Sequence, residues 1–114
     1  MKVLVCGGRN YDQYNRVAHA LGTLNRKYPV ERIIHGGCRG ADKLASDWAK
    51  RNGISESIYY ARWEEEGKAA GPLRNQRMID NEHPDAAIAF KGGRGTADMI
   101  KRLKDANVPV WEVE

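Results

Sequence analysis

Cysteine is scarce in this 114-residue sequence, which contains only Cys6 and Cys38. Two thiols are too few for a disulfide framework, so we expect a protein of a reducing compartment. A long apolar run is also missing, because the N-terminal stretch Met1–Cys6 is far too short for a signal peptide or a membrane span. We therefore expect a cytoplasmic chain that makes no membrane contact and is close to complete as written.

Several common nucleotide-binding motifs are absent. No glycine turn completes G-x-G-x-x-G with its acidic partner, which argues against the NAD site of ordinary dehydrogenases. The absence of G-x-x-x-x-G-K-[ST] argues against a P-loop NTPase. The net charge of +4 comes without a dense basic stripe, so a dedicated duplex-binding protein is not indicated. The same mild charge suits a phosphate-bearing ligand and leaves nucleic acid open as a partner.

Short apolar segments alternate with amphipathic segments along the whole chain. The expected strands are Val3–Cys6, Glu31–His35, a strand within Ile54–Ala61 centred on Ile58–Tyr60, Ala86–Phe90 and Val108–Val113. Apolar residues at helical spacing predict helices that contain Val17–Leu24, Ala41–Ala49, Leu73–Asn81 and Asp98–Leu103. This alternation predicts a parallel sheet with helices on both faces.

The sequence thus predicts a single Rossmann-like α/β domain over residues 1–114, with three layers and about five parallel strands. Right-handed crossovers favour the strand order 3-2-1-4-5, and a proline near the start of the last strand indicates an edge position. We also expect Asp12 to cap the first helix and Pro72 to begin the third helix. Trp48 and Trp111 are expected in the core.

Three glycine-rich turns each follow an expected strand, and each carries an arginine. In this strand order the strands before them are neighbours, so the turns meet at the sheet edge where ligands bind. Glycine lets the backbone approach an anion, and the first N–H groups of a following helix lack internal partners. One glycine turn is typical of ordinary loops, whereas three at one edge favour a phosphate-bearing nucleotide. The residues expected to bind it are Gly7, Gly8, Arg9, Gly36, Gly37, Arg39, Gly40, Asp42, Gly92, Gly93, Arg94, Gly95 and Thr96.

The third expected helix adds Arg74, Asn75 and Arg77 near the same edge. Arg74 and Arg77 are three positions apart and share a helix face, and a guanidinium binds phosphate in a bidentate manner. A solvated basic face has the same pattern, so both interpretations stay open. In the stretch 62–71, which we expect to be irregular, Trp63 either stacks on a base or closes the edge of the core. Lys68 is a further candidate for a phosphate contact.

The acidic residues and potential metal ligands each have a structural interpretation beside a functional one. Asp42 either complements the dipole of its helix or holds a ribose hydroxyl, and Asp98 is expected in the first turn of the last helix. The run Glu64–Glu66 is typical of a solvated charge run, with a general acid as the alternative. His35 and Cys38 form a lone His-x-x-Cys, so we predict no metal site and a structural or nucleotide-contacting His35.

The segments that carry these residues resemble the SLOG superfamily, and particularly its small stand-alone members. His35–Asp42 is similar to the Gly-x-x-Arg-Gly-[Ile/Ala]-Asp element of the Smf/DprA branch. Leu73–Met78, Asp85 and Gly92–Thr96 resemble the Arg-[Lys/Asn] helix and the Pro-Gly-Gly-x-Gly-Thr-x-x-Glu motif of the LOG (Lonely Guy) phosphoribohydrolases. Cys6–Arg9 stands where those proteins carry their first glycine loop, so the likeness runs in order through nearly the whole chain.

This resemblance implies a homodimer that binds a nucleotide such as AMP, ADP-ribose or an NAD-like molecule, with no required cofactor. LOG enzymes hydrolyse the N-glycosidic bond of nucleoside 5′-monophosphates, and Arg74 matches their catalytic arginine. Met99 stands where the motif ends in glutamate, and Lys91 replaces its leading proline. A thioether is not a base and does not stabilise an oxocarbenium-like centre, so we expect weak or absent hydrolysis. The alternative, from the Smf/DprA likeness, is a module that binds single-stranded nucleic acid.

Overall fold

The computed structural model describes all 114 residues and contains one five-stranded parallel sheet. The strand order is β3-β2-β1-β4-β5, and every neighbouring pair is parallel. The strands are β1 (Lys2–Cys6), β2 (Arg32–His35), β3 (Ser55–Ile58), β4 (Ala86–Phe90) and β5 (Val110–Val113). The predicted strand order is confirmed, as is the edge position of the last strand.

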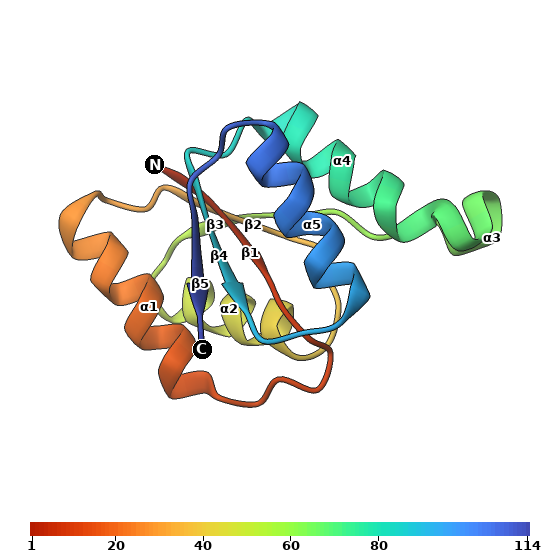
Figure 1. Cartoon of the computed structure of the whole chain (residues 1–114). Helices are drawn as coiled ribbons and strands as arrows, with labels where there is room; N and C mark the ends of the chain where they lie inside the picture. The colour runs from red at the N-terminus through yellow and green to blue at the C-terminus, as the bar shows by residue number, and fades with distance from the viewer.

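Four longer helices cover the two faces of the sheet (Figure 1). Helices α1 (Tyr14–Lys27) and α2 (Ala41–Arg51) pack on one face, and α4 (Ala70–Glu82) and α5 (Arg94–Asp105) pack on the other. The chain adds β2 and β3 on one side of β1, and then adds β4 and β5 on the other side of β1. Right-handed crossovers in these two opposite directions place the later helices on the opposite face of the sheet. None of the helices has both the length and the apolar character needed to cross a bilayer.

Alternating side chains of the central strand divide the core in two. Val3 and Val5 contribute to the apolar cluster beneath α1 and α2, whereas Leu4 and Cys6 contribute to the cluster beneath α4 and α5. Successive strand residues point to opposite faces, so a strand that is covered on both faces is apolar throughout. The three layers expected from the sequence therefore follow from β1 itself.

The stretch expected to be irregular contains helical turns. Helix α3 (Trp63–Glu66) and the short 3-10 helix η1 (Gly67–Ala69) lead directly into α4. Pro72 is consequently the third residue of its helix and not the first, which is tolerated because the first N–H groups of a helix have no internal partner. In Figure 1 α3 projects away from the sheet beyond the start of α4.

Three other local predictions are wrong. Strand β3 ends at Ile58, which leaves Tyr60 exposed beyond it, so the strand is not centred on Ile58–Tyr60. Asp12 does not cap α1, because Gln13 is the capping residue and makes no side-chain cap. Trp48 lies in the core as predicted, but Trp111 is 41% exposed because β5 is an edge strand.

Gly40 and Gly53 both have a positive φ, but only Gly40 lies against another turn, so the two positions test how much this close approach matters. Gly40 (φ +80°) lies against the backbone of Gly8 and Arg9, where a Cβ would come within 2.6 Å of the Arg9 carbonyl carbon. Gly53 (φ +64°) has nothing within 4 Å of the position that a Cβ would take. We expect Gly53→Ala to lower the free energy of unfolding by about 1 kcal/mol. Gly40→Ala adds a backbone clash, so we expect a loss of about 3 kcal/mol or more.

Urea denaturation of both variants measures this difference. Equal losses at the two positions would show that only the backbone conformation matters, and that the turns do not need to approach this closely.

Candidate functional site

The three glycine turns meet at the carboxyl edge of the sheet. The Gly8 N–H donates to the Lys91 carbonyl at 3.0 Å, and the Gly8 carbonyl accepts from the Ala41 N–H at 3.1 Å. Gly8 of the β1 turn therefore bonds both to the β4 turn and to the first residue of α2. The predicted convergence of the turns is confirmed.

Some of the glycines serve this packing, and others face open space. A Cβ on Gly7 would lie 2.6 Å from the Ala41 Cβ, and one on Gly92 would lie 2.7 Å from the Gly8 nitrogen. By contrast, Gly93 and Gly95 have nothing within 4 Å of a Cβ position. The first pair lets the turns touch, and the second pair leaves room at the start of α5.

A cavity of about 700 Å³ opens where the turns meet, between α4 and the start of α5. Its size is typical of small-molecule and cofactor sites. Most of the residues predicted to bind the ligand line it, namely Gly7, Gly8, Arg9, Gly36, Asp42, Trp63, Lys68, Arg74, Asn75, Gly93, Arg94, Gly95 and Thr96. The remaining predicted residues, Gly37, Arg39, Gly40, Arg77 and Gly92, lie outside the cavity lining.

The first turn of α5 presents unused backbone donors to this cavity. Gly93 precedes the helix without a side-chain cap, and no acidic residue lies in the first turn. Ala97 is the first residue whose N–H bonds back, to the Gly93 carbonyl at 3.0 Å, so the N–H groups of Arg94, Gly95 and Thr96 have no backbone acceptor. Free N–H groups at the positive end of a helix dipole favour an anion.

Arg74 places a positive charge without a carboxylate partner in the cavity wall. The residue is only 9% exposed, and its Nη1 donates to the carbonyl oxygens of Gly36 at 2.9 Å and Tyr59 at 3.2 Å. Nε donates to Asn75 Oδ1 at 3.1 Å, and none of the ion pairs of the chain includes Arg74. A buried charge is unfavourable unless it is paired, so this guanidinium favours an anionic partner in the cavity.

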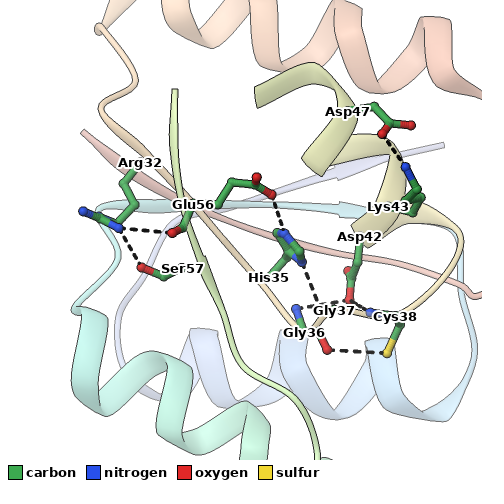
Figure 2. A network of polar contacts seen from close by, with 10 residues as sticks. All are labelled: Arg32, His35, Gly36, Gly37, Cys38, Asp42, Lys43, Asp47, Glu56 and Ser57. Carbon is green, nitrogen blue, oxygen red and sulfur yellow. Dashed lines mark hydrogen bonds and ion pairs between the residues drawn. The ribbon is translucent and has the colours of Figure 1, made fainter. Parts of the chain in front are cut away.

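The β2 turn differs from the first turn of α5 because the N–H groups of Gly36, Gly37 and Cys38 already have acceptors within the protein. Asp42 Oδ2 accepts from the N–H groups of Gly36 at 3.1 Å and Cys38 at 3.2 Å, and the Gly37 N–H donates to His35 Nδ1 at 3.0 Å (Figure 2). These amides are therefore not free for a ligand. The turn holds Arg74 in place through the Gly36 carbonyl.

Asp42 occupies the first turn of α2, as one of its two interpretations predicted. Burial raises the pKa of Asp42 above its ordinary value, and the N–H groups of Cys38 and Gly36 and the charge of Arg74 oppose that rise. One carboxylate oxygen is committed to the β2 turn, so the main observed role of Asp42 is to hold that turn.

Arg77 pairs with α3 and does not face the cavity. Its two terminal nitrogens bond to both oxygens of Glu66, at 3.1 and 3.0 Å. This bidentate bond with Arg77 lowers the pKa of Glu66. The pair fixes α3 beside α4.

Trp63 of α3 lies at the cavity edge and is 52% exposed. Its ring lies 3.6 Å from the position that a Cβ on Gly71 would take. Trp63 is thus not a core residue, and stacking on a base stays a prediction.

The comparisons with known proteins agree with these motifs. The model of the YspA, cpYpsA-related SLOG family matches residues 1–65. Gene 61 protein of Mycobacterium phage D29 is 34% identical over 117 residues, which cover 96% of this chain and 93% of that protein. The chain belongs to the YspA, cpYpsA-related SLOG family. The SLOG resemblance predicted from the sequence is confirmed, and family membership indicates a nucleotide-related Rossmann-like protein.

In this SLOG protein the cavity also has an apolar, sulfur-rich part that was not predicted. Cys6, Cys38, Met78 and Met99 all line the cavity. Nothing in the spacing of these residues indicated that their four side chains line one cavity. No group of three or more histidine, cysteine, aspartate or glutamate side chains is placed to hold a metal ion.

Asp98 lines the cavity from a different position than predicted. It is the fifth residue of α5 and not in the first turn, and it accepts from Asn75 Nδ2 at 3.1 Å and Arg102 Nε at 2.8 Å. Burial raises the pKa of Asp98, but the hydrogen bonds from Arg102 and Asn75 and the nearby positive charges together outweigh this effect. The pKa of Asp98 therefore lies below its ordinary value. The spacing of Asp98 and Arg102, four residues apart on one helix, was the signal available in the sequence.

The two cysteines of the cavity are expected to differ in reactivity. Burial, with smaller effects of the Asp42 and Glu112 charges, raises the pKa of Cys6 to about 12, so almost no thiolate exists near pH 8. Cys38 is more exposed. We expect iodoacetamide at pH 8 to alkylate Cys38 in the folded protein and Cys6 only after denaturation, as measured by peptide mass spectrometry. The variant Cys38→Ser is the control, and equal labelling of both thiols in the native protein would contradict the structure.

Proposed function

We propose that this SLOG protein binds a nucleotide or a nucleotide-derived ligand with a phosphoribosyl group in the cavity. The observation that supports it best is the position of a buried, unpaired guanidinium, Arg74, in the same cavity as the uncapped start of α5. A phosphate group satisfies both, because it accepts several hydrogen bonds and carries the missing negative charge.

The charges around the cavity support the same ligand. Arg9, Lys68, Arg74 and Arg94 line it, and the two carboxylates that also line it, on Asp42 and Asp98, are already hydrogen-bonded within the protein. In the proposed arrangement the phosphate binds the N–H groups of Arg94, Gly95 and Thr96. The base then extends towards the exposed ring of Trp63.

We further propose that the protein acts as a ligand-binding sensor and not as an efficient phosphoribohydrolase. Met99 is 1% exposed and stands where the LOG motif carries its glutamate, so this part of the cavity is apolar. The adjacent Asp98 is held by Asn75 and Arg102, and its lowered pKa makes it unsuited to act as a general acid.

The binding proposal is tested by thermal denaturation with AMP, ADP-ribose and NAD. At a concentration one hundred times Kd, a ligand stabilises the fold by about 2.7 kcal/mol, which corresponds to roughly 10 °C in Tm for a domain of this size. We expect Arg94→Ala to weaken binding by roughly 10- to 100-fold through loss of a charge-assisted hydrogen bond.

Arg39→Ala is the matched control, because Arg39 is an exposed arginine on a glycine turn outside the cavity lining. We expect it to leave affinity unchanged. If no mononucleotide binds and a single-stranded oligonucleotide binds with a steep salt dependence, the nucleic-acid alternative replaces this proposal.

Catalysis is tested by measuring ribose 5-phosphate released from AMP. We expect little or no release from the natural protein, because Met99 supplies no carboxylate, and increased release from Met99→Glu. Met99→Gln is the control for size and polarity, since it has a similar length and no charge. Rapid hydrolysis by the natural protein would contradict the sensor proposal.

A further inference from the structure

A chain of hydrogen bonds links the neighbouring strands β3 and β2 to the turn that follows β2. It contains Glu56 of β3, His35 of β2 and Gly37 of the β2 turn, and we call it the His35 bridge. His35 is 2% exposed and does not line the cavity. Its Nε2 lies 2.8 Å from Glu56 Oε1, and its Nδ1 lies 3.0 Å from the Gly37 nitrogen. Figure 2 shows the imidazole between these two partners.

The two bonds determine the protonation of the ring. The Gly37 N–H is a donor, so His35 Nδ1 must hold a lone pair. Glu56 is an acceptor, so Nε2 must carry the hydrogen. The neutral Nε2–H tautomer alone satisfies both partners, because an imidazolium would direct an N–H group at the Gly37 N–H.

The Gly37 bond fixes the peptide groups on which Arg74 depends. Gly37 has φ +68°, and the side chains of Tyr60 and Ile58 occupy the space where its Cβ would lie. The preceding carbonyl, from Gly36, accepts from Arg74 Nη1 at 2.9 Å. Loss of the Gly37 bond would release the turn and, with it, the acceptor that orients the guanidinium.

Charged groups from three elements surround the ring. Glu56 and Asp42 face it from β3 and α2, while Lys50 of α2 and Arg74 of α4 act on those two carboxylates. Burial raises the pKa of Glu56, but hydrogen bonds from Ser46 and His35 and the charge of Lys50 bring it below its ordinary value. Glu56 is therefore ionised near neutral pH and remains an acceptor for Nε2–H.

We propose that His35 is a positioning residue for ligand binding, which as its neutral Nε2–H tautomer holds the β2 turn so that Arg74 faces the cavity. The inference rests on the proposed nucleotide site but concerns a residue that does not touch the ligand. It accounts for a buried histidine at the end of β2 that accepts from the turn following it.

Two substitutions separate the two sides of the ring. In His35→Asn the amide oxygen takes the place of Nδ1 and accepts from Gly37, whereas in His35→Gln the amide nitrogen takes the place of Nε2 and donates to Glu56. We expect Asn to keep the AMP dissociation constant within threefold of the natural protein, and Gln to raise it at least tenfold. Similar weakening in both variants, or none in Gln, would overturn the proposal.

The bridge is also tested without any ligand. Nitrogen-15 NMR of the natural protein is expected to show the Nε2–H tautomer of His35 and a protected Gly37 amide. Hydrogen exchange of the Gly37 amide should accelerate in His35→Gln, which loses the acceptor, and should stay slow in His35→Asn, which keeps it. Equal Gly37 exchange in the natural protein and in His35→Gln would overturn the proposal.

The NMR experiment distinguishes this inference from the proposed function. If the natural protein binds no nucleotide, the proposed function fails, while Gly37 exchange still decides whether His35 holds the turn. If nucleotides bind but Gly37 is insensitive to His35, the binding site stands and the positioning role fails.

Discussion

The backbone of Gly8 holds together the edge of the sheet at which the cavity lies. Its N–H bonds to the turn after β4, and its carbonyl bonds to the first residue of α2, so three segments distant in sequence share one point. Side chains at Gly7, Gly40 or Gly92 would separate these segments, because their Cβ positions overlap neighbouring atoms. The cavity depends on this contact, since the turns form part of its walls.

The three turns look alike in sequence but differ in what they offer. The β2 turn uses three of its amides on Asp42 and His35, and it contributes a carbonyl that holds Arg74. The turn that leads into α5 leaves the first N–H groups of that helix free. The β1 turn connects the other two segments through the N–H and the carbonyl of Gly8. The proposed anion site needs both free donors and a rigid support, and these two properties belong to different turns.

Much of this arrangement could be predicted from the sequence, because it depends on regular patterns. Continuous apolar strands, helical spacing and glycine turns were sufficient for the sheet order and for the edge at which the turns meet. Helix α3 was not predicted, because four residues are too few to show a helical period. Arg77 and Glu66 lie eleven positions apart, so their pairing became visible only when α3 and α4 were in place. The use of amides by side chains, as at Asp42, left no signal beyond the residue type.

The central claim is that the first turn of α5 binds the phosphate of a nucleotide while the β2 turn acts only as support. A titration of the nitrogen-15-labelled protein with AMP, followed by amide chemical shifts, tests it most directly. We expect the largest shifts at Arg94, Gly95 and Thr96, and small shifts at Gly36, Gly37 and Cys38. Absence of any shift at α5, or larger shifts in the β2 turn, would contradict the claim.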